Sequence, residues 1–136
     1  MGKISNKALN KVLLRTQGCQ FAHNYERMQS LSLTYCSSSV LQPLYKDRPT
    51  EETVHAMQRY LEYFNTHPLA IPFILGIQAA LEESTDEDQK DTCRAIKTSL
   101  MGPFAGLGDS MLNLTWYPIA GSIGASMCIN DGSLVG

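Results

Sequence analysis

One stretch of this chain constrains its fold more than any other: the run from Thr98 to Asn130, in which Asp109 is the sole charged residue. The run exceeds the roughly 20 residues that a helix needs to cross the hydrocarbon core of a bilayer. Glycines and one proline crowd its start, from Gly102 to Gly108, and favour broken or re-entrant backbone over one straight helix. An ionisable side chain within such a segment is by default a functional candidate. The run therefore predicts an integral membrane protein of the transporter kind.

The other charged residues lie almost entirely within residues 1–66 and 82–97, so the average composition hides this run. Over all 136 residues the mean hydropathy is only -0.15, an ordinary value for a soluble chain. The length allows one domain with a real core. The formal net charge of -2 comes without a basic stripe, which gives no reason to expect a nucleic-acid partner.

Cysteine and histidine spacing argues against a metal site. The cysteines form no C-x-x-C pair, and the histidines add no ligand spacing to them, so we predict no metal and no cofactor. We expect buried, inert thiols at most of the cysteines, which are Cys19, Cys36, Cys93 and Cys128. The first 20 residues are polar and basic and contain no continuous apolar core of a secretory signal.

An amphipathic helix is predicted after Ser5, which is a good N-cap residue. Its apolar positions fall on one side and its cations around the other; the two sets are Leu9, Val12, Leu13 and Thr16, and Lys7, Lys11 and Arg15. Such a helix lies on the anionic cytoplasmic face of a membrane or packs on its own domain, and both alternatives stay open.

A polar and aromatic segment follows, with the sequence Asn24-Tyr25-Glu26-Arg27-Met28-Gln29 at its centre. Helical spacing would place Tyr25, Met28 and Ser32 on one face. Sugar hydroxyls need both donors and acceptors, and amides and carboxylates in apolar surroundings supply them. The segment is therefore a candidate sugar site, with a solvated helix as the alternative.

Two further helical segments are predicted. Thr50 would cap the first, with Glu51 and Glu52 favourably placed in its first turn and an end near Asn65 or Thr66. Its expected core face consists of Val54, Met57, Leu61 and Phe64. The second, residues 68–81, has no charge and is too short to cross a bilayer, which is typical of buried, interfacial or re-entrant segments. His67 at its mouth would contact ligand or act as a cap.

The acidic stretch from Glu82 to Asp88 is interpreted as a solvated loop. A helix over residues 89–101 would follow, then a glycine-rich turn. Asp109 and Ser110 would cap the next helix, which runs through Trp116 to Met127. Capping and a functional role for Asp109 are both open.

Five motifs in order along the chain resemble the IID component of the mannose/fructose/sorbose class of phosphotransferase system. They are Asn24-Tyr25-Glu26-Arg27-Met28-Gln29, Phe64-Asn65-Thr66-His67-Pro68, Pro72-Phe73-Ile74-Leu75-Gly76, Gly102-Pro103-Phe104-Ala105-Gly106-Leu107-Gly108-Asp109-Ser110 and Pro118-Ile119-Ala120-Gly121-Ser122-Ile123-Gly124-Ala125-Ser126. The resemblance covers nearly the whole chain. A complete family member is about twice as long, so residues 1–136 are expected to be the N-terminal part of a IID permease domain, from a fragment or a truncated product.

The resemblance implies an all-α protein of the bacterial inner membrane, with a cytoplasmic N-terminus, amphipathic N-terminal helices and broken or re-entrant membrane segments. It implies a IIC partner with which the chain forms the translocation unit for a mannose-type hexose, and a homo-oligomer of IIC–IID pairs. A IIB phosphocarrier would phosphorylate the sugar, and this subunit would carry no catalytic residue of its own. By the same likeness Asn24 and Glu26 are candidate sugar-facing groups, and Asn65, His67 and Asp109 are candidates for gating or contact between subunits.

The family pattern is not followed everywhere. His23 stands where the family commonly has tryptophan, and Tyr117 stands where it usually has arginine, which puts ion pairing at that position in doubt. Two readings of other classes remain. One is a small soluble helical interaction module, and the other, weaker one is an enzyme with Asp109 as base, which lacks a nearby nucleophile.

Overall fold

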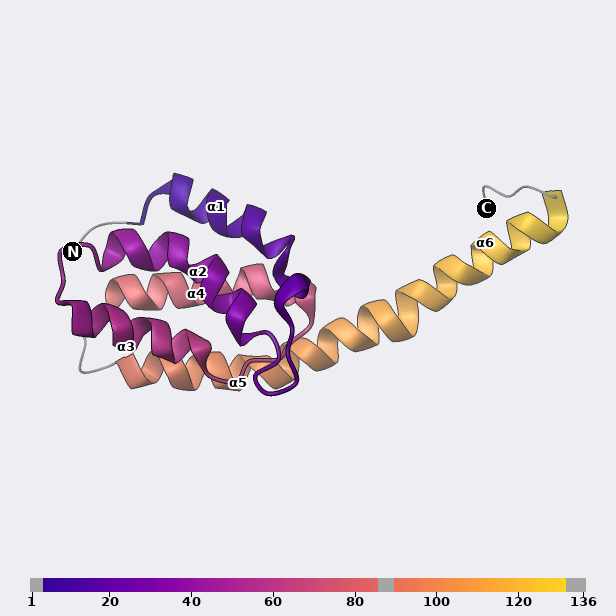
Figure 1. Cartoon of the computed structure of the whole chain (residues 1–136). Helices are drawn as coiled ribbons and strands as arrows, with labels where there is room; N and C mark the ends of the chain where they lie inside the picture. Colours follow the sequence, from indigo (N-terminus) through magenta and orange to yellow (C-terminus); the bar gives the residue numbers. More distant parts are fainter. Residues whose placement is uncertain (1–3, 86–89, 132–136) are drawn as a thin grey trace.

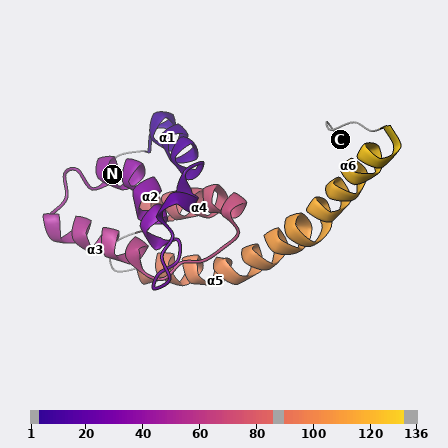
Figure 2. The same cartoon turned by 45° about the vertical axis from the view of Figure 1, so that its right-hand side comes forward.

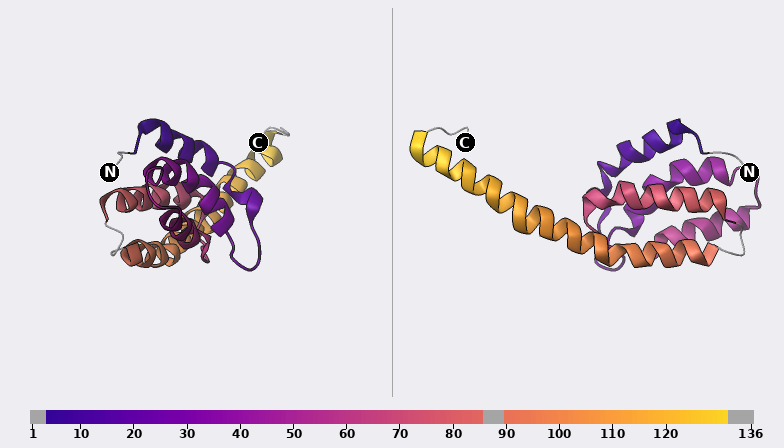
Figure 3. Two further views of the ribbon diagram at one scale, coloured as in Figure 1. Left: turned by 60° about the vertical axis from the view of Figure 1, so that its left-hand side comes forward. Right: turned by 180° about the vertical axis from the view of Figure 1, so that it is seen from behind.

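A bundle of helices with one long helical arm makes up the computed structural model, which describes residues 4–85 and 90–131 (Figure 1). Within these residues there is no strand, which confirms the all-α prediction. None of the helices in these two ranges combines the length and the apolarity needed to cross a membrane. Three further views agree that the arm leaves one end of the bundle and extends away from it (Figures 2 and 3).

Helix α1 (Asn6–Thr16) begins as predicted, because the Ser5 hydroxyl accepts a hydrogen bond from the Ala8 amide at 3.2 Å. The helix buries Ala8, Val12 and Thr16 against the bundle. Arg15 fixes its other end, since its guanidinium donates to the Tyr35 carbonyl at 2.8 Å. The helix therefore packs on its own domain and still turns its lysines outward.

The short 3₁₀ helix η1 (Cys19–Ala22) leads to a turn and then to α2 (Ser30–Leu44). Helix α2 is the centre of the bundle, because it packs against α1, α3 and α4. Its fully buried side chains include Leu33, Cys36 and Leu41. The helical face predicted for Tyr25, Met28 and Ser32 is wrong, because residues 24–28 form the turn that precedes α2.

Helix α3 (Thr50–Leu61) differs from its prediction in three ways. Its N-cap is Pro49, so Thr50 is already helical and does not cap it. The helix buries Ala56 and Tyr60 and leaves Val54 about half exposed, so its core face is rotated from the predicted one, although Phe64 beyond its end is fully buried as predicted. It also ends earlier than predicted, because the chain becomes extended at Glu62 in order to pair with the turn before α2.

Helix α4 (Ile71–Ser84) follows the 3₁₀ turn η2 (Pro68–Ala70) and lies inside the bundle. Ile71, Ile74 and Leu75 are buried, as the buried alternative for the uncharged segment predicted, whereas Leu69 and Phe73 of the same segment are exposed. Gln78 is buried as well, and its amide donates to the Cys93 carbonyl at 3.0 Å. That bond ties α4 to the next helix.

Helix α5 (Lys90–Gly108), the π-helix η4 (Asp109–Trp116) and α6 (Tyr117–Asp131) follow one another without interruption. We call residues 102–131 the arm. The predicted glycine-rich turn and the break at Gly102 and Pro103 are wrong, because both residues lie inside α5. Both residues are exposed, and a Cβ added at Gly102 would meet nothing within 4 Å. The regular α geometry changes only later, at Asp109.

The arm carries a series of exposed apolar side chains. They are Leu107, Met111, Leu114, Trp116, Tyr117, Ile119, Ile123, Met127 and Ile129. Large apolar residues exposed in such number mark an interaction surface.

Candidate functional site

A tight turn displays the first of the family-like motifs. The backbone groups of Asn24 and Met28 exchange two hydrogen bonds, at 3.2 and 2.9 Å. The Asn24 side-chain oxygen accepts a third from the Arg27 amide, at 2.8 Å. Met28 has a φ of 52°, a left-handed conformation that non-glycine residues adopt only where the surroundings hold them. The turn is thus rigid in its backbone, whereas the side chains of Tyr25 and Glu26 are exposed.

Gln29 joins this turn to the second motif. Its amide group makes two hydrogen bonds with the backbone of Thr66, donating to the carbonyl at 2.7 Å and accepting from the N–H at 3.0 Å. Its own backbone N–H donates to the Phe64 carbonyl at 2.8 Å. Both Gln29 and Thr66 are buried, so these bonds replace solvent and fix the two loops against each other.

The second motif in turn rests on the base of the arm. The Thr66 hydroxyl donates to the Met101 carbonyl at 3.3 Å, and the backbone N–H of Asn65 donates to the Met101 sulfur at 3.3 Å. The His67 ring lies against Gly108, where a Cβ would be 2.8 Å from His67 Cδ2 and still closer to its Cγ and Cβ. Only glycine fits at this point. Three motifs far apart in the sequence therefore meet where the arm leaves the bundle.

The predicted site residues occupy this region in different ways. Asn24 holds its own turn and lines an open pocket of about 330 Å³ with His23, Tyr25 and Met28. The Glu26 side chain is 81% exposed, lies 3.4 Å from Arg27 Nε, and lines a separate pocket beside α3. The structure thus brings the two sugar-facing candidates to one turn but to two pockets.

The other three predicted residues lie along the contact between the second loop and the arm. The Asn65 side chain is exposed. His67 caps η2, since its Nδ1 accepts from the Leu69 amide at 3.4 Å, which is the predicted capping role. Asp109 is exposed, accepts from the Asn113 amide at 3.0 Å, and directly follows the glycine under His67. It does not cap a separate helix, because α5 continues through it into η4.

Hydrogen bonding is the chemistry that this arrangement supports. An exposed carboxylate and an exposed amide on a rigid turn can bind hydroxyl groups. Within residues 4–85 and 90–131 no three or more His, Cys, Asp or Glu side chains are grouped to hold a metal ion.

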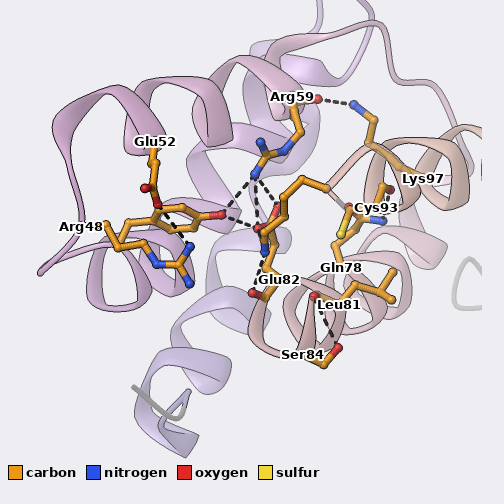
Figure 4. Close-up of polar contacts among 11 residues, drawn as sticks. Arg48, Glu52, Arg59, Gln78, Leu81, Glu82, Ser84, Cys93 and Lys97 are labelled. Carbon is orange, nitrogen blue, oxygen red and sulfur yellow. Dashed lines mark hydrogen bonds and ion pairs between the residues drawn. The ribbon is translucent and has the colours of Figure 1, made fainter. Parts of the chain in front are cut away.

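Sequence reasoning missed a buried polar network around Glu82, which we call the Glu82 network (Figure 4). Glu82 is 1% exposed and accepts a hydrogen bond from the Tyr45 hydroxyl at 2.6 Å. Lys90 Nζ lies 2.9 Å from its carboxylate, and Arg59 Nη2 lies 3.3 Å away. The network joins α3, α4 and α5 to Tyr45, the residue that follows α2. The prediction that Glu82 lies in a solvated loop is wrong, although residues 86–88 of that loop lie outside the described part of the chain.

Burial and hydrogen bonding act against each other at Glu82. Desolvation alone would raise the pKa of its carboxyl, but the Tyr45 hydroxyl, Lys90 and Arg59 together lower the pKa below the ordinary 4.5. On α5, burial lowers the pKa of Lys97, and the nearby Glu62 carboxylate partly opposes this. Lys97 donates to the Arg59 carbonyl and so ties α5 to α3. The available signal was that Glu82 directly follows the uncharged segment 68–81, but the sequence does not say which cations pack against the Glu82 carboxylate.

Comparison with known proteins places these features in a family. The model of the mannose/fructose/sorbose family IID component of the phosphotransferase system (PTS) matches residues 3–136. The PTS mannose-specific EIID component of Escherichia coli K12 is 35% identical, over 98% of this chain and 48% of that protein. The fructose permease IID component of Bacillus subtilis strain 168 is 32% identical, over 98% of this chain and 49% of that protein.

A solved structure gives the same result. In the cryo-EM structure of the mannose transporter ManYZ in complex with microcin E492, one chain superposes with a TM-score of 0.87 at 34% identity. The match covers 99% of this chain and 50% of that one. The chain spans about half the length of the curated relatives that it matches.

Proposed function

Because this chain belongs to the mannose/fructose/sorbose family of PTS IID components, we propose that it acts as a membrane subunit in phosphoenolpyruvate-dependent sugar uptake. With a IIC subunit it forms the translocation unit for a mannose-type hexose. A IIB phosphocarrier phosphorylates the sugar that the two subunits present. Residues 1–136 are the N-terminal portion of the permease domain.

The single observation that carries this proposal beyond family membership is the arm. It projects from the bundle with exposed apolar side chains along its length, and Asp109 is the only charged residue between Thr98 and Asn130. Such a surface is stable only when lipid or another apolar surface covers it. In the proposed assembly the arm lies in the bacterial inner membrane against the IIC subunit, and the N-terminus lies in the cytoplasm.

We assign the polar side chains of the motif region to two roles. Glu26 and the amide nitrogen of Asn24 face the sugar, because the turn presents them to the outside on a rigid backbone. Asn65, His67 and Asp109 lie where the loop meets the arm and take part in gating or in contact with IIC. None of them transfers phosphate; the contribution of the subunit is to hold a hydroxyl where IIB can react with it.

The separate interaction module is the less favoured alternative. Such a module would bind through residues 54–64 and 71–81, but these ranges supply core residues of the bundle itself, which are Tyr60, Phe64, Ile71, Ile74 and Leu75. The arm and the family match both favour the permease subunit.

A chimera provides the test of the sugar role. Residues 3–136 replace the matching part of the Escherichia coli mannose-specific EIID component, and mannose uptake is measured in cells that lack the native subunit. We expect Glu26→Gln to weaken uptake and apparent sugar affinity, because it removes a carboxylate that accepts hydrogen bonds from the sugar hydroxyl groups. Glu51→Gln is the matched control, since Glu51 is an exposed glutamate in the first turn of α3. Equal uptake by the Glu26 and Glu51 variants would contradict the sugar role.

The membrane role has its own test. The chain is expressed with and without the IIC subunit, and membranes are separated from cytosol before detergent extraction. We expect the chain in the membrane fraction and co-purified with IIC. Recovery of a well-behaved monomer from the cytosol without detergent, with no affinity for IIC, would overturn the proposal.

A further inference from the structure

One face of the bundle is apolar and exposed but belongs neither to the motif region nor to the arm. Leu14 of α1 is 75% exposed and Phe21 of η1 is 94% exposed. Leu31 and Tyr35 of α2 are also exposed, and the four side chains line one open pocket of about 560 Å³. We call these four residues the N-terminal patch.

Exposed lysines lie beside this patch on α1, and the three helices that form the patch contain no acidic residue. Lys7 and Lys11 are exposed and precede Leu14 by seven and three residues, which places all three on the same side of α1. From Asn6 to Leu44 the only carboxylate is Glu26, which lies 3.4 Å from Arg27.

The patch is also preformed. The Arg15 guanidinium donates to the Ser38 hydroxyl at 2.6 Å and lies 4.4 Å from the centre of the Tyr35 ring. The Ser32 hydroxyl donates to the Cys19 carbonyl and holds η1 on α2. The surfaces of α1, η1 and α2 are thus fixed to each other, and docking would order few groups.

We propose that the N-terminal patch docks on the surface of an anionic phospholipid bilayer. Phe21, Leu14 and Leu31 enter the headgroup region, and Lys7 and Lys11 lie against the lipid phosphates. Charge complementarity selects this occupant, because an apolar patch flanked by lysines is the composition that binds anionic membrane surfaces. Exposed aromatic rings are favoured at the same depth. The inference deepens the proposed function and rests on it for the presence of a bilayer.

Tryptophan fluorescence tests this proposal. Trp116 on the arm is the only tryptophan, so a Phe21→Trp variant in a Trp116→Phe background reports on the patch alone. The full chain is reconstituted in vesicles of brominated phosphatidylcholine, with or without phosphatidylglycerol. We expect bromine to quench the new tryptophan strongly only when phosphatidylglycerol is present, and less at high salt.

The lysines supply a matched pair of variants. Lys7→Gln with Lys11→Gln should lower the ratio of docked to undocked patch by roughly 30-fold, because two cations near an anionic surface are lost. Lys7→Arg with Lys11→Arg keeps the charge and should leave the quenching unchanged. Equal quenching in neutral vesicles, or no response to the glutamine pair, overturns the proposal. Shielding of the tryptophan only after addition of the IIC subunit also overturns it and makes the patch a protein interface.

The wild-type chain separates this inference from the proposed function. Its Trp116 lies on the arm and should be quenched in both kinds of vesicle. If Trp116 is quenched and the tryptophan at position 21 is not, only the proposed docking of the patch is refuted. If the tryptophan at position 21 is quenched and Trp116 is not, the proposed location of the arm in the membrane is refuted.

Discussion

Replacing Gly108 with alanine should force the His67 loop away from the arm. The added Cβ would be 2.8 Å from His67 Cδ2 and nearer to two other atoms of that side chain, whereas ordinary carbon contacts are about 3.5–4.0 Å. The loop or the arm must therefore move by about 1 Å. Overpacking of this kind costs about 1–3 kcal/mol.

Gly106 provides the matched control, because a Cβ there meets nothing within 4 Å. Alanine in a helix interior is favoured over glycine by about 0.5–1 kcal/mol, and this gain is common to both variants. The difference between Gly108→Ala and Gly106→Ala therefore isolates the clash. We expect the Gly108 variant to be less stable than the Gly106 variant by about 1–3 kcal/mol.

Thermal unfolding of the two variants in one detergent, followed by circular dichroism, measures this difference. A change of about 1 kcal/mol corresponds to a few degrees in Tm for a chain of this size. Two variants of His67 then test the cause. His67→Ala keeps the close Cβ and should not rescue Gly108→Ala, whereas His67→Gly removes it and should. Equal Tm values for the two glycine variants, or rescue by His67→Ala as complete as by His67→Gly, would refute the reasoning.

Three buried residues, Glu82, Gln29 and Cys36, give the remaining predictions. Glu82→Gln should lower the free energy of unfolding by about 3–5 kcal/mol in urea, because it leaves buried cations without their counter-charge. Glu52→Gln, which removes the more exposed pair with Arg48, is the control and should lower it by about 0–1 kcal/mol. Because folding lowers the pKa of Glu82, its ionised form stabilises the fold above pH 4.5. This contribution to the free energy of unfolding disappears as the pH falls through the folded-state pKa. Glu82→Gln lacks it, so the stability of that variant should fall less steeply in acid than the stability of the wild type. Gln29→Leu should lower the free energy of unfolding by about 1–3 kcal/mol, because it leaves the Thr66 backbone groups unpaired. Gln58→Leu at an exposed position is the control for this urea measurement. Cys36 should resist alkylation at neutral pH until the chain unfolds, because burial raises the pKa of its thiol to about 11. Mass spectrometry measures the rate of modification, and a rate equal to that of the denatured chain would contradict this prediction.

The features that were predicted correctly depend on residues close together in the chain. The Ser5 cap acts on an amide three residues away, and the burial of Ile71, Ile74 and Leu75 follows from an uncharged run. The features that were missed depend on distant partners. Gln29 holds the turn at residues 24–28 against Thr66, 37 residues away, and helical spacing contains no sign of this contact. The same pairing ends α3 at Leu61, before Pro68 can act.

The sequence by itself determined that the chain is helical, where its apolar segments lie, and to which family its motifs belong, because these follow from local hydrogen bonding and from residue order. Only the tertiary structure decided that Glu82 is buried among cations and that His67 closes on Gly108. The physical reason is that desolvation and steric contact depend on which distant segments pack together. Those packing partners are set by the whole bundle, and no single stretch of the chain specifies them.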